Sequence, residues 1–317
     1  MEIFKFTPAF KQYIWGGNNL KTEFGKNTPE PPVAESWEVS AHKDGFSVVS
    51  EGADKGKTIP ELIEKYGRDF YGNAFDEGEE FPLLLKILDA QDKLSVQVHP
   101  DDDYAFKNEN GTKGKNEAWY ILKAEAGAKL IYGFKEDITK ADFEKAIEDK
   151  KLGDILNSVD CNEGDVFYIP AGTVHAVGKG LIIAEIQQSS NNTYRVYDYD
   201  RRDKEGNLRE LHVEKAIAVS DFSSSLGKEK TIPEIKKDGE NTIKSFVKNN
   251  FFCFDKVEVE KNFTLKTEKT YKIVFVAEGE FEIDGKKGVK GDSFIVPACI
   301  SEAEINGAGK ILVFYQK

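Results

Sequence analysis

The chain has 317 residues, of which 39% are hydrophobic and 32% are charged, an ordinary composition for a folded protein with a sizeable core. The net charge of −12 argues against nucleic acid as a partner, because no concentration of Lys and Arg dominates the sequence. No apolar run approaches the roughly 18 residues of a membrane-spanning helix, so we expect no membrane span.

The first segment in chain order, MEIFKFTPAF, lacks the basic start and the apolar core of a signal peptide. The three cysteines, Cys161, Cys253 and Cys299, are odd in number and lie far apart. This usage disfavours a disulfide framework and is typical of a reducing compartment. We therefore expect a cytoplasmic protein.

From residue 35 onward the sequence mainly predicts short β-strands with turns between them. These stretches are rich in β-branched and aromatic residues, and Gly, Asp or Pro lies close to each. They read ESWEVSAH, FSVVSEG, LLLKILDA, KLSVQVHP, AWYILKAEAGAKLIYGF, DVFYIPAG and GLIIAEIQQ. Such a density of strands favours a barrel or a sandwich.

Two stretches predict helical insertions, near 58–72 and over 137–159. In the first, Thr58 and Glu61 have the spacing of a capping box, which marks the start of a helix. In the second, apolar residues recur at helical spacing among good helix formers.

The stretch LSVQVHPDD, from Leu94 to Asp102, alternates strictly. Alternation places Leu94, Val96 and Val98 on one face of a strand and Ser95, Gln97 and His99 on the other. The first face is suited to a core, whereas the second carries a hydroxyl, an amide and an imidazole.

Two later segments carry further polar groups in patterned positions. In GKNEAWYIL, the side chains of Lys115, Glu117 and Trp119 share one face of a strand. In GDVFYIPAGTVH, residues 164–175, the pattern G-x5-P-x-G-x-x-H ends in His175, and its Pro and Gly fix a turn before that histidine.

These segments predict a metal site, because alternate side chains point into a small barrel. Gln97, His99, Glu117 and His175 would offer two imidazole nitrogens, a carboxylate and an amide oxygen to one divalent cation. This set suits zinc, although Co, Mn, Fe and Ni fit the same residue types. A lone Q-x-H would equally suit a solvent-exposed strand face.

The other histidines, His42 and His212, lack ligand spacing, and we interpret them as structural or rim residues.

A repeat divides the chain. GDVFYIPAGTVH resembles GDSFIVPACISE at 291–302, and similar strand pairs precede both. The second copy has Cys299 in place of Gly172 and Glu302 in place of His175, so we expect the same scaffold without the same chemistry. The polar stretch between the copies predicts a linker over 226–247, with a catalytic domain over 1–225 and a second domain over 248–317.

The third segment matches the second motif of the cupin family, although Gly178 stands where that motif tends to end in Asn. Gln97 replaces the first histidine of the usual cupin H-x-H. Together with KQYIWGGNNL, AESWEVSAH and AEIQQSSNNTYRVYDYDR, the segments closely resemble the type I mannose-6-phosphate isomerases, in particular the shorter bacterial group. The resemblance spans at least residues 1–215. It implies a mainly β fold of two cupin (jelly-roll) barrels, the first with helical insertions and the second degenerate.

The resemblance also implies a reaction, the interconversion of mannose 6-phosphate and fructose 6-phosphate. The metal ligands of the family fall on Gln97, His99, Glu117 and His175. A metal would help most where negative charge develops on O1 and O2 of an enediol or enediolate. Arg195 matches the family's active-site arginine, with a salt bridge to Asp198 or Asp200 as its alternative role.

Further residues take candidate roles by the same resemblance. Lys115 and Glu185 match positions proposed for proton transfer or ring opening; a rim lysine and a structural carboxylate are the alternatives. Arg201 and Arg202 are candidates for binding phosphate, or solvated charges. Ser95 can donate a hydroxyl hydrogen bond to substrate. Trp15 matches a tryptophan near the sugar, or belongs to the core.

Two other functions fit the same scaffold. One is an isomerase for another sugar phosphate, such as glucose 6-phosphate, because pocket contacts decide specificity. The other is a non-catalytic sensor, which we would expect to have lost some of Lys115, Glu185 and Arg195. We expect a small-molecule sugar phosphate as the partner, and the sequence leaves the oligomeric state open.

Overall fold

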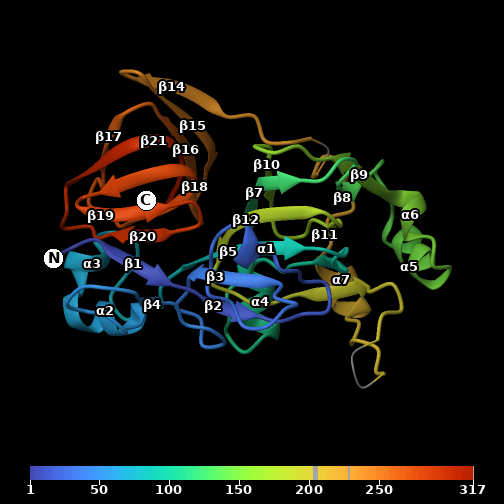
Figure 1. Ribbon diagram of the computed structural model, residues 1–317. Helices are drawn as coiled ribbons and strands as arrows, with labels where there is room; N and C mark the ends of the chain where they lie inside the picture. The colour runs from blue at the N-terminus through green and yellow to red at the C-terminus, as the bar shows by residue number, and fades with distance from the viewer. Residues whose placement is uncertain (203–205, 228, 317) are drawn as a thin grey trace.

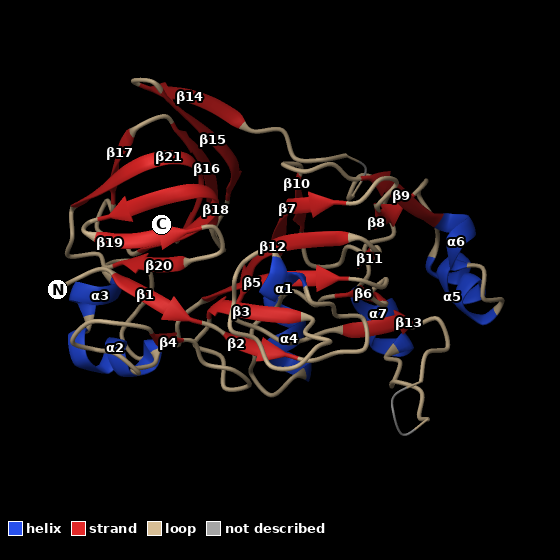
Figure 2. Cartoon of the chain, in the orientation of Figure 1, coloured by secondary structure: helices blue, strands red, loops and turns tan. Residues whose placement is uncertain are grey.

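A computed structural model of the protein describes residues 1–202, 206–227 and 229–316. The fold is mainly β, with few and short helices, and its strands form three sheets (Figures 1 and 2). The predicted β class is therefore confirmed. The three sheets are open, and the finer expectation of two cupin (jelly-roll) barrels stays a prediction.

Two antiparallel sheets enclose the site region. The first has six strands in the order β10 (Val166–Ile169), β7 (Glu117–Ala124), β12 (Leu181–Gln188), β5 (Leu83–Ala90), β3 (Glu35–Val39) and β2 (Ala9–Lys11). The second has five strands in the order β13 (Tyr194–Tyr197), β6 (Val96–Val98), β11 (His175–Val177), β8 (Lys129–Phe134) and β9 (Leu156–Asp160).

The third sheet has ten strands and joins both ends of the chain. Its main path is β14 (Glu234–Asp238), β15 (Asn241–Lys248), β16 (Cys253–Val259), β21 (Glu302–Tyr315), β18 (Lys272–Ile283), β20 (Ser293–Val296), β1 (Phe4–Thr7) and β4 (Val48–Val49). In addition, β17 (Asn262–Lys266) pairs with β21, and β19 (Lys286–Val289) pairs with β18. The amino-terminal strand β1 thus lies beside β20, in the part of the molecule formed by the carboxyl-terminal third (Figure 1).

The helices are α1 (Asn19–Thr22), α2 (Ile59–Tyr66), α3 (Arg68–Tyr71), α4 (Asp102–Asn108), α5 (Lys140–Glu148), α6 (Leu152–Ile155) and α7 (Val213–Val219). None of these, within the described residues, has the length and apolar character needed to cross a membrane. The capping box of Thr58 and Glu61 is confirmed at the start of α2. Gly67, with a φ of 53°, separates α2 from α3.

The helical prediction for 137–159 is wrong at its end. Helices α5 and α6 occupy its first part, but residues from Leu156 onward form β9, which pairs with β8. Lys150, with a φ of 57°, lies just after α5 and cannot continue a right-handed helix. Cross-strand pairing with β8 then overrides the helical spacing of the apolar residues.

The predicted linker over 226–247 is also wrong in its second half. Residues from Glu234 onward form β14 and β15, a hairpin at the edge of the ten-stranded sheet. All five residues of β14 are exposed, so this strand lacks the alternating apolar signal of a half-buried strand. The division of the chain into two domains stays a prediction.

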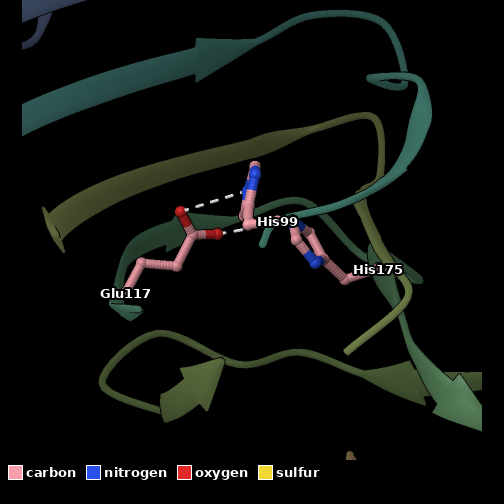
Figure 3. A group of neighbouring side chains, drawn as sticks. All are labelled: His99, Glu117 and His175. Carbon is pink, nitrogen blue, oxygen red and sulfur yellow. Dashed lines mark ion pairs between the residues drawn. The ribbon is translucent and has the colours of Figure 1, made fainter. Parts of the chain in front are cut away.

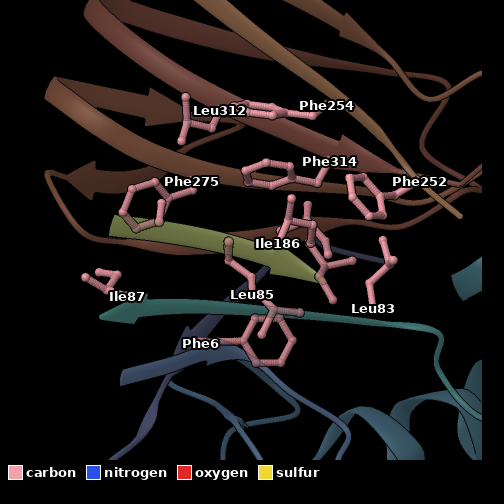
Figure 4. Packing of buried hydrophobic residues seen from close by; sticks show 14 of the residues in the cluster. Phe6, Leu83, Leu85, Ile87, Ile186, Phe252, Phe254, Phe275, Leu312 and Phe314 are labelled. Carbon is pink, nitrogen blue, oxygen red and sulfur yellow. The ribbon is translucent and has the colours of Figure 1, made fainter. Parts of the chain in front are cut away.

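Alternation along the strands separates two faces of the six-stranded sheet. One face packs on the ten-stranded sheet in a shared apolar core, where Leu83, Leu85, Ile87 and Ile186 meet Phe252, Phe254, Phe275, Leu312 and Phe314 (Figure 4). The opposite face points toward the five-stranded sheet and carries both a second apolar cluster and the candidate site residues. The far face of the five-stranded sheet packs on helices through Val96, Val98, Phe134, Phe143, Leu152 and Ala216.

The interior of the carboxyl-terminal part is apolar. Val257, Val274, Val276, Phe294 and Val313 pack together there and are buried. Glu302, which stands where the first repeat has His175, is exposed. The side chains within this part therefore form a packed core.

Candidate active site

Strand register aligns three polar side chains on the five-stranded sheet. Arg195 on β13 lies opposite Gln97 on β6, and Gln97 lies opposite His175 on β11. His99 follows the end of β6 and is buried. Residues that are paired across neighbouring strands point to the same face. The short strands thus gather an arginine, an amide and an imidazole in one row.

The facing six-stranded sheet supplies the opposing charges. Glu117 and Trp119 lie on the same face of β7, and register pairs Trp119 with Glu185 on β12 and Glu185 with Lys86 on β5. The indole nitrogen of Trp119 donates to Oε2 of Glu185 at 3.0 Å. Nζ of Lys86 lies 3.6 Å from Oε1 of Glu185.

His99, Glu117 and His175 converge between the two sheets (Figure 3). Nε2 of His99 lies 3.5 Å from Oε2 of Glu117, and Nε2 of His175 lies 3.4 Å from Oε1 of the same carboxylate. All three residues are buried, and their candidate ligand atoms lie within 4.8 Å of one another. This group is suited to holding a metal ion.

The ring nitrogens of both histidines are oriented for a metal. Nδ1 of His99 lies 2.8 Å from the carbonyl oxygen of Asn192, and Nδ1 of His175 lies 2.9 Å from that of Thr173. Nδ1 donates in each case, which leaves the Nε2 lone pair directed toward Glu117. Burial lowers the pKa of both imidazoles, that of His175 to about 3, and so keeps them neutral as ligands must be.

Glu117 fits the same interpretation. Its Oε1 is buried and has no hydrogen-bond partner among the described residues. Burying such an oxygen costs free energy unless a cation binds to it. Burial alone would raise its pKa, but the charge of Lys115 and the nearby His99 hold the pKa well below its usual range. The carboxylate is therefore ionised and can act as a ligand.

Lys115 and Gln97 complete the surroundings of this group. The ammonium of Lys115 contacts Glu117 and lies 3.0 Å from Nε2 of His99, so a positive charge already lies beside the candidate ligands. Nε2 of Gln97 lies 3.4 Å from Nε2 of His175. Rotating the side-chain amide of Gln97 by 180° would exchange its nitrogen and oxygen. The amide oxygen, which is the atom that binds metals, would then lie beside Nε2 of His175.

A cavity of about 250 Å³ opens beside the metal group. Of the candidates expected from the sequence, it is lined by Trp15, Ser95, Gln97, Lys115, Glu185 and Arg195. Sequence reasoning missed Tyr13, Glu35, Lys86, Asn191, Thr193 and Arg209, which line it as well. Lys86 carried a signal, since it is the one charge within the apolar run LLLKIL. Arg209 lies in a stretch without a recognisable pattern.

Leu94, Trp15 and two further histidines lie in or near the site region. Leu94 lines the cavity together with Ser95, so its expected place beside Val96 and Val98 is wrong, because β6 begins only at Val96 and the alternation does not extend before it. Trp15 both lines the cavity and belongs to the apolar cluster between the sheets. His42 and His212 lie outside the metal group.

Arg201 and Arg202 are not among the described residues that line the cavity. Arg201 donates to the carbonyl oxygen of Lys93 at 2.6 Å and contacts Asp198. Arg202 donates to the carbonyl oxygen of Gly206 at 2.6 Å. Asp198 pairs with Arg201 and Arg209 rather than with Arg195.

Comparisons with known proteins place the chain in a family. The family model of the phosphomannose isomerase type I catalytic domain matches residues 3–136, and that of the mannose-6-phosphate isomerase cupin domain matches residues 242–316. The chain is 40% identical to the mannose-6-phosphate isomerase ManA of Bacillus subtilis (strain 168), with 97% of each chain covered. It is also 40% identical to the mannose-6-phosphate isomerase of Streptococcus mutans, with 94% of this chain and 93% of the relative covered.

A solved structure gives the same result in three dimensions. The crystal structure of the mannose 6-phosphate isomerase from Bacillus subtilis superposes with a TM-score of 0.93 at 37% sequence identity, covering 99% of this chain and 100% of that one. Similarity of this extent covers both the region of the metal group and the carboxyl-terminal sheet. The chain therefore belongs to the type I phosphomannose isomerase family.

Proposed function

We propose that the protein is a metal-dependent aldose–ketose isomerase that interconverts mannose 6-phosphate and fructose 6-phosphate. The observation that carries the proposal is the buried group of His99, Glu117 and His175 beside a cavity lined by Lys115 and Glu185. The same cavity holds two guanidinium groups, which suit an anionic substrate. Membership of the family supports both the reaction and the substrate.

The metal is most simply Zn²⁺, held by Gln97, His99, Glu117 and His175. Two imidazole nitrogens, one carboxylate and one amide oxygen match the preferences of zinc. With only one anionic ligand, the bound ion would keep a net positive charge and supply Lewis acidity toward a sugar oxygen.

The residues of the cavity supply the proton chemistry. Isomerisation takes a proton from C2 of the open-chain aldose and returns one to C1, through a cis-enediol or enediolate. Burial and the charge of Glu117 raise the pKa of Glu185, which brings this carboxylate closer to the range in which a base can accept and return a proton. Nζ of Lys115 lies 3.9 Å from Oε1 of Glu185, so either group can serve as the carrier or open the sugar ring.

The remaining cavity residues are proposed to hold the substrate. Arg195 presents a positive charge that can stabilise an enediolate or steady the sugar. Ser95 can donate its hydroxyl hydrogen to a sugar oxygen, and Trp15 offers an aromatic wall.

The architecture proposed for this activity is a catalytic cupin barrel over 1–225 and a degenerate cupin barrel over 248–317. The match of residues 242–316 to a cupin-domain model supports the second of these. A cytoplasmic location, expected from three cysteines that are all free thiols, belongs to the proposal as well.

A coupled assay of fructose 6-phosphate formation from mannose 6-phosphate tests the function directly. Activity should be lost on thorough chelation and return when Zn²⁺ is added back. Turnover that is insensitive to metal removal would contradict the metal mechanism. Turnover with glucose 6-phosphate alone would assign another substrate, and metal binding without any turnover would indicate a sensor.

A further inference from the structure

Among the described residues, four cationic side chains line the cavity, and two of them lie beside carboxylates near the metal group. Lys115 contacts Glu117, and Lys86 lies 3.7 Å from Glu35 and 3.6 Å from Glu185. The other two are the guanidiniums of Arg195 and Arg209. The phosphate of a sugar substrate needs positively charged donors away from the reacting carbons. These two arginines are therefore the candidates within the cavity.

Arg209 reaches the cavity because its segment folds back along β13. The backbone N–H of His212 donates to the carbonyl oxygen of Arg195 at 2.8 Å. Nη1 of Arg195 in turn donates to the carbonyl oxygen of Glu210 at 2.8 Å. These contacts bring residues 209–212 beside Arg195, and they place two arginines that are 14 positions apart in one cavity wall.

Asp198 fixes the orientation of Arg209. Nε of Arg209 lies 2.7 Å from Oδ2 of Asp198, and Nη2 lies 2.5 Å from Oδ1, which is the two-pronged geometry of a strong guanidinium–carboxylate pair. Asp198 is only 4% exposed, and it also contacts Arg201. Arg201 also lies 3.5 Å from Asp92, so Arg195, Arg201 and Arg209 together place three guanidiniums against these two carboxylates. Positive charge is thus in excess, as an anion site requires.

Arg201 lies behind this pair rather than in the cavity. Its Nη1 donates to the carbonyl oxygen of Lys93 at 2.6 Å, its Nε donates to the carbonyl oxygen of Asp198 at 3.3 Å, and its guanidinium stacks 5.4 Å from the ring of Tyr199. Its nitrogens are thus engaged by the chain, so Arg201 is suited to holding Asp198 in place.

We infer that Arg209 binds the phosphate group of the substrate together with Arg195, and that Asp198 is the positioning residue that holds Arg209 in the cavity wall. The inference rests on the proposed function, which it extends by naming the residue that distinguishes a sugar phosphate from a free sugar. Arg209 thus takes the phosphate-binding role that the sequence had suggested for Arg201 and Arg202.

Steady-state kinetics with mannose 6-phosphate, and calorimetric binding of glucitol 6-phosphate and of glucitol, test this assignment on the metal-loaded full-length enzyme. Arg209→Gln should lower kcat/KM roughly 100-fold, as expected when one member of a charged contact is removed. Its affinity for glucitol 6-phosphate should fall by a similar factor, whereas its affinity for glucitol and its metal content should not change. Arg209→Lys keeps the positive charge but cannot make the two-pronged contact of a guanidinium. It should therefore recover part of the lost kcat/KM.

Three further variants separate this role from a general loss of structure. Asp198→Asn should raise KM and leave kcat nearly unchanged, and Asp198→Asn combined with Arg209→Gln should be no worse than Arg209→Gln alone. Arg68→Gln, on the exposed surface of α3, is the matched control and should behave as wild type.

Two outcomes overturn the inference while the proposed function stands. One is an Arg209→Gln enzyme with wild-type kcat/KM; the other is a full loss of phosphate discrimination in Arg201→Gln or Arg202→Gln with none in Arg209→Gln. A wild-type enzyme that does not isomerise mannose 6-phosphate would instead overturn the proposed function. Weaker binding of both glucitol and glucitol 6-phosphate by Arg209→Gln would also count against the assignment.

Discussion

His99 and His175 each have one ring nitrogen bound to a backbone carbonyl oxygen and the other facing Glu117. Backbone carbonyls do not change with protonation or side-chain rotation, so they fix the imidazole tautomers firmly. The orientation of both imidazoles is thereby set partly by the main chain. The neutral histidines and the ionised carboxylate are ready to bind a cation without a proton being displaced from the imidazoles.

Replacing a proposed ligand should therefore separate metal binding from catalysis. We expect His175→Ala to lose bound metal and activity together, whereas Arg195→Ala keeps the metal and loses turnover. Metal content by atomic emission, measured beside kcat on the same samples, gives the comparison. A fully active Arg195→Ala enzyme would show that the role given to this arginine is wrong.

The pKa of Glu185 leads to a second prediction at this scale. A base must be ionised, so kcat/KM should fall as the pH drops through the pKa of Glu185, which burial and the charge of Glu117 raise above its usual range. The charge of Lys86 acts against this rise. Lys86→Met should thus move the acid limb of the pH profile to higher pH, whereas Lys129→Met on the surface should not. An acid limb that is unmoved in Lys86→Met would argue against Glu185 as the base.

Much of the site could be predicted at the residue scale, and the reason is the period of a strand. Gln97 and His99 on one stretch, and Lys115 and Glu117 on another, occupy alternating positions, so their faces followed from the sequence alone. Glu185 was a candidate only through the family resemblance. The position of Arg209 could not be inferred in this way. Its place in the cavity depends on a chain reversal that brings residues 209–212 back along β13, and no local pattern encodes that reversal.

Among the elements, the chain approaches β8 closely at Gly178, the residue directly after β11. A Cβ atom at this position would lie 1.9 Å from the carbonyl oxygen of Lys129, which is backbone and cannot easily move. The Asn that usually follows in the cupin motif would therefore not fit here. The strand that carries His175 depends on this glycine for its pairing with β8.

Gly178→Ala should destabilise the protein by about 1–3 kcal/mol, the range found when a well-packed site is overfilled. It should also weaken metal binding, since β11 must shift with His175 on it. Gly153→Ala in α6 is the matched control, because nothing lies within 4 Å of its would-be Cβ atom. Thermal denaturation and metal titration of both variants provide the measurements, and equal midpoints would refute the packing argument.

Element boundaries were predicted less well than element types. The capping box of α2 was found because a few neighbouring residues encode it. The end of the 137–159 stretch was misassigned because β9 owes its conformation to pairing with β8, a contact that local spacing does not reveal. Strand β14 was missed because an exposed edge strand carries no alternating apolar pattern. Strand β15 was missed because it owes its conformation to pairing with β14 and β16, contacts that local spacing does not reveal.

For the whole molecule, the main feature is the apolar core shared by the six-stranded and ten-stranded sheets (Figure 4). A buried ionic contact crosses the same boundary: Lys26 pairs with Glu38 on β3 at 2.8 Å and donates to the carbonyl oxygen of Gly291 at 2.8 Å. The carboxyl-terminal sheet therefore supports the rear of the sheet that carries Glu117 and Glu185.

This arrangement predicts that the two parts unfold together. Phe275→Ala, deep in the shared core, should lower the free energy of unfolding by about 3–5 kcal/mol. It should also destabilise the cavity, although Phe275 is not among its lining residues. Denaturation followed in parallel by far-UV circular dichroism and by loss of metal should give one coincident transition. Two separated transitions would show that the parts fold independently.

The pairing of β1 with β20 has a consequence for synthesis on the ribosome. Phe4 lies opposite Ile295, so the first strand made must wait for one of the last, about 290 residues later. At the usual 5–20 residues per second, that interval is roughly 15–60 s. Once β12 has been made, the apolar face of the six-stranded sheet lacks its cover until the carboxyl-terminal strands follow. The shared core of the two sheets therefore cannot form before translation has reached the carboxyl-terminal strands.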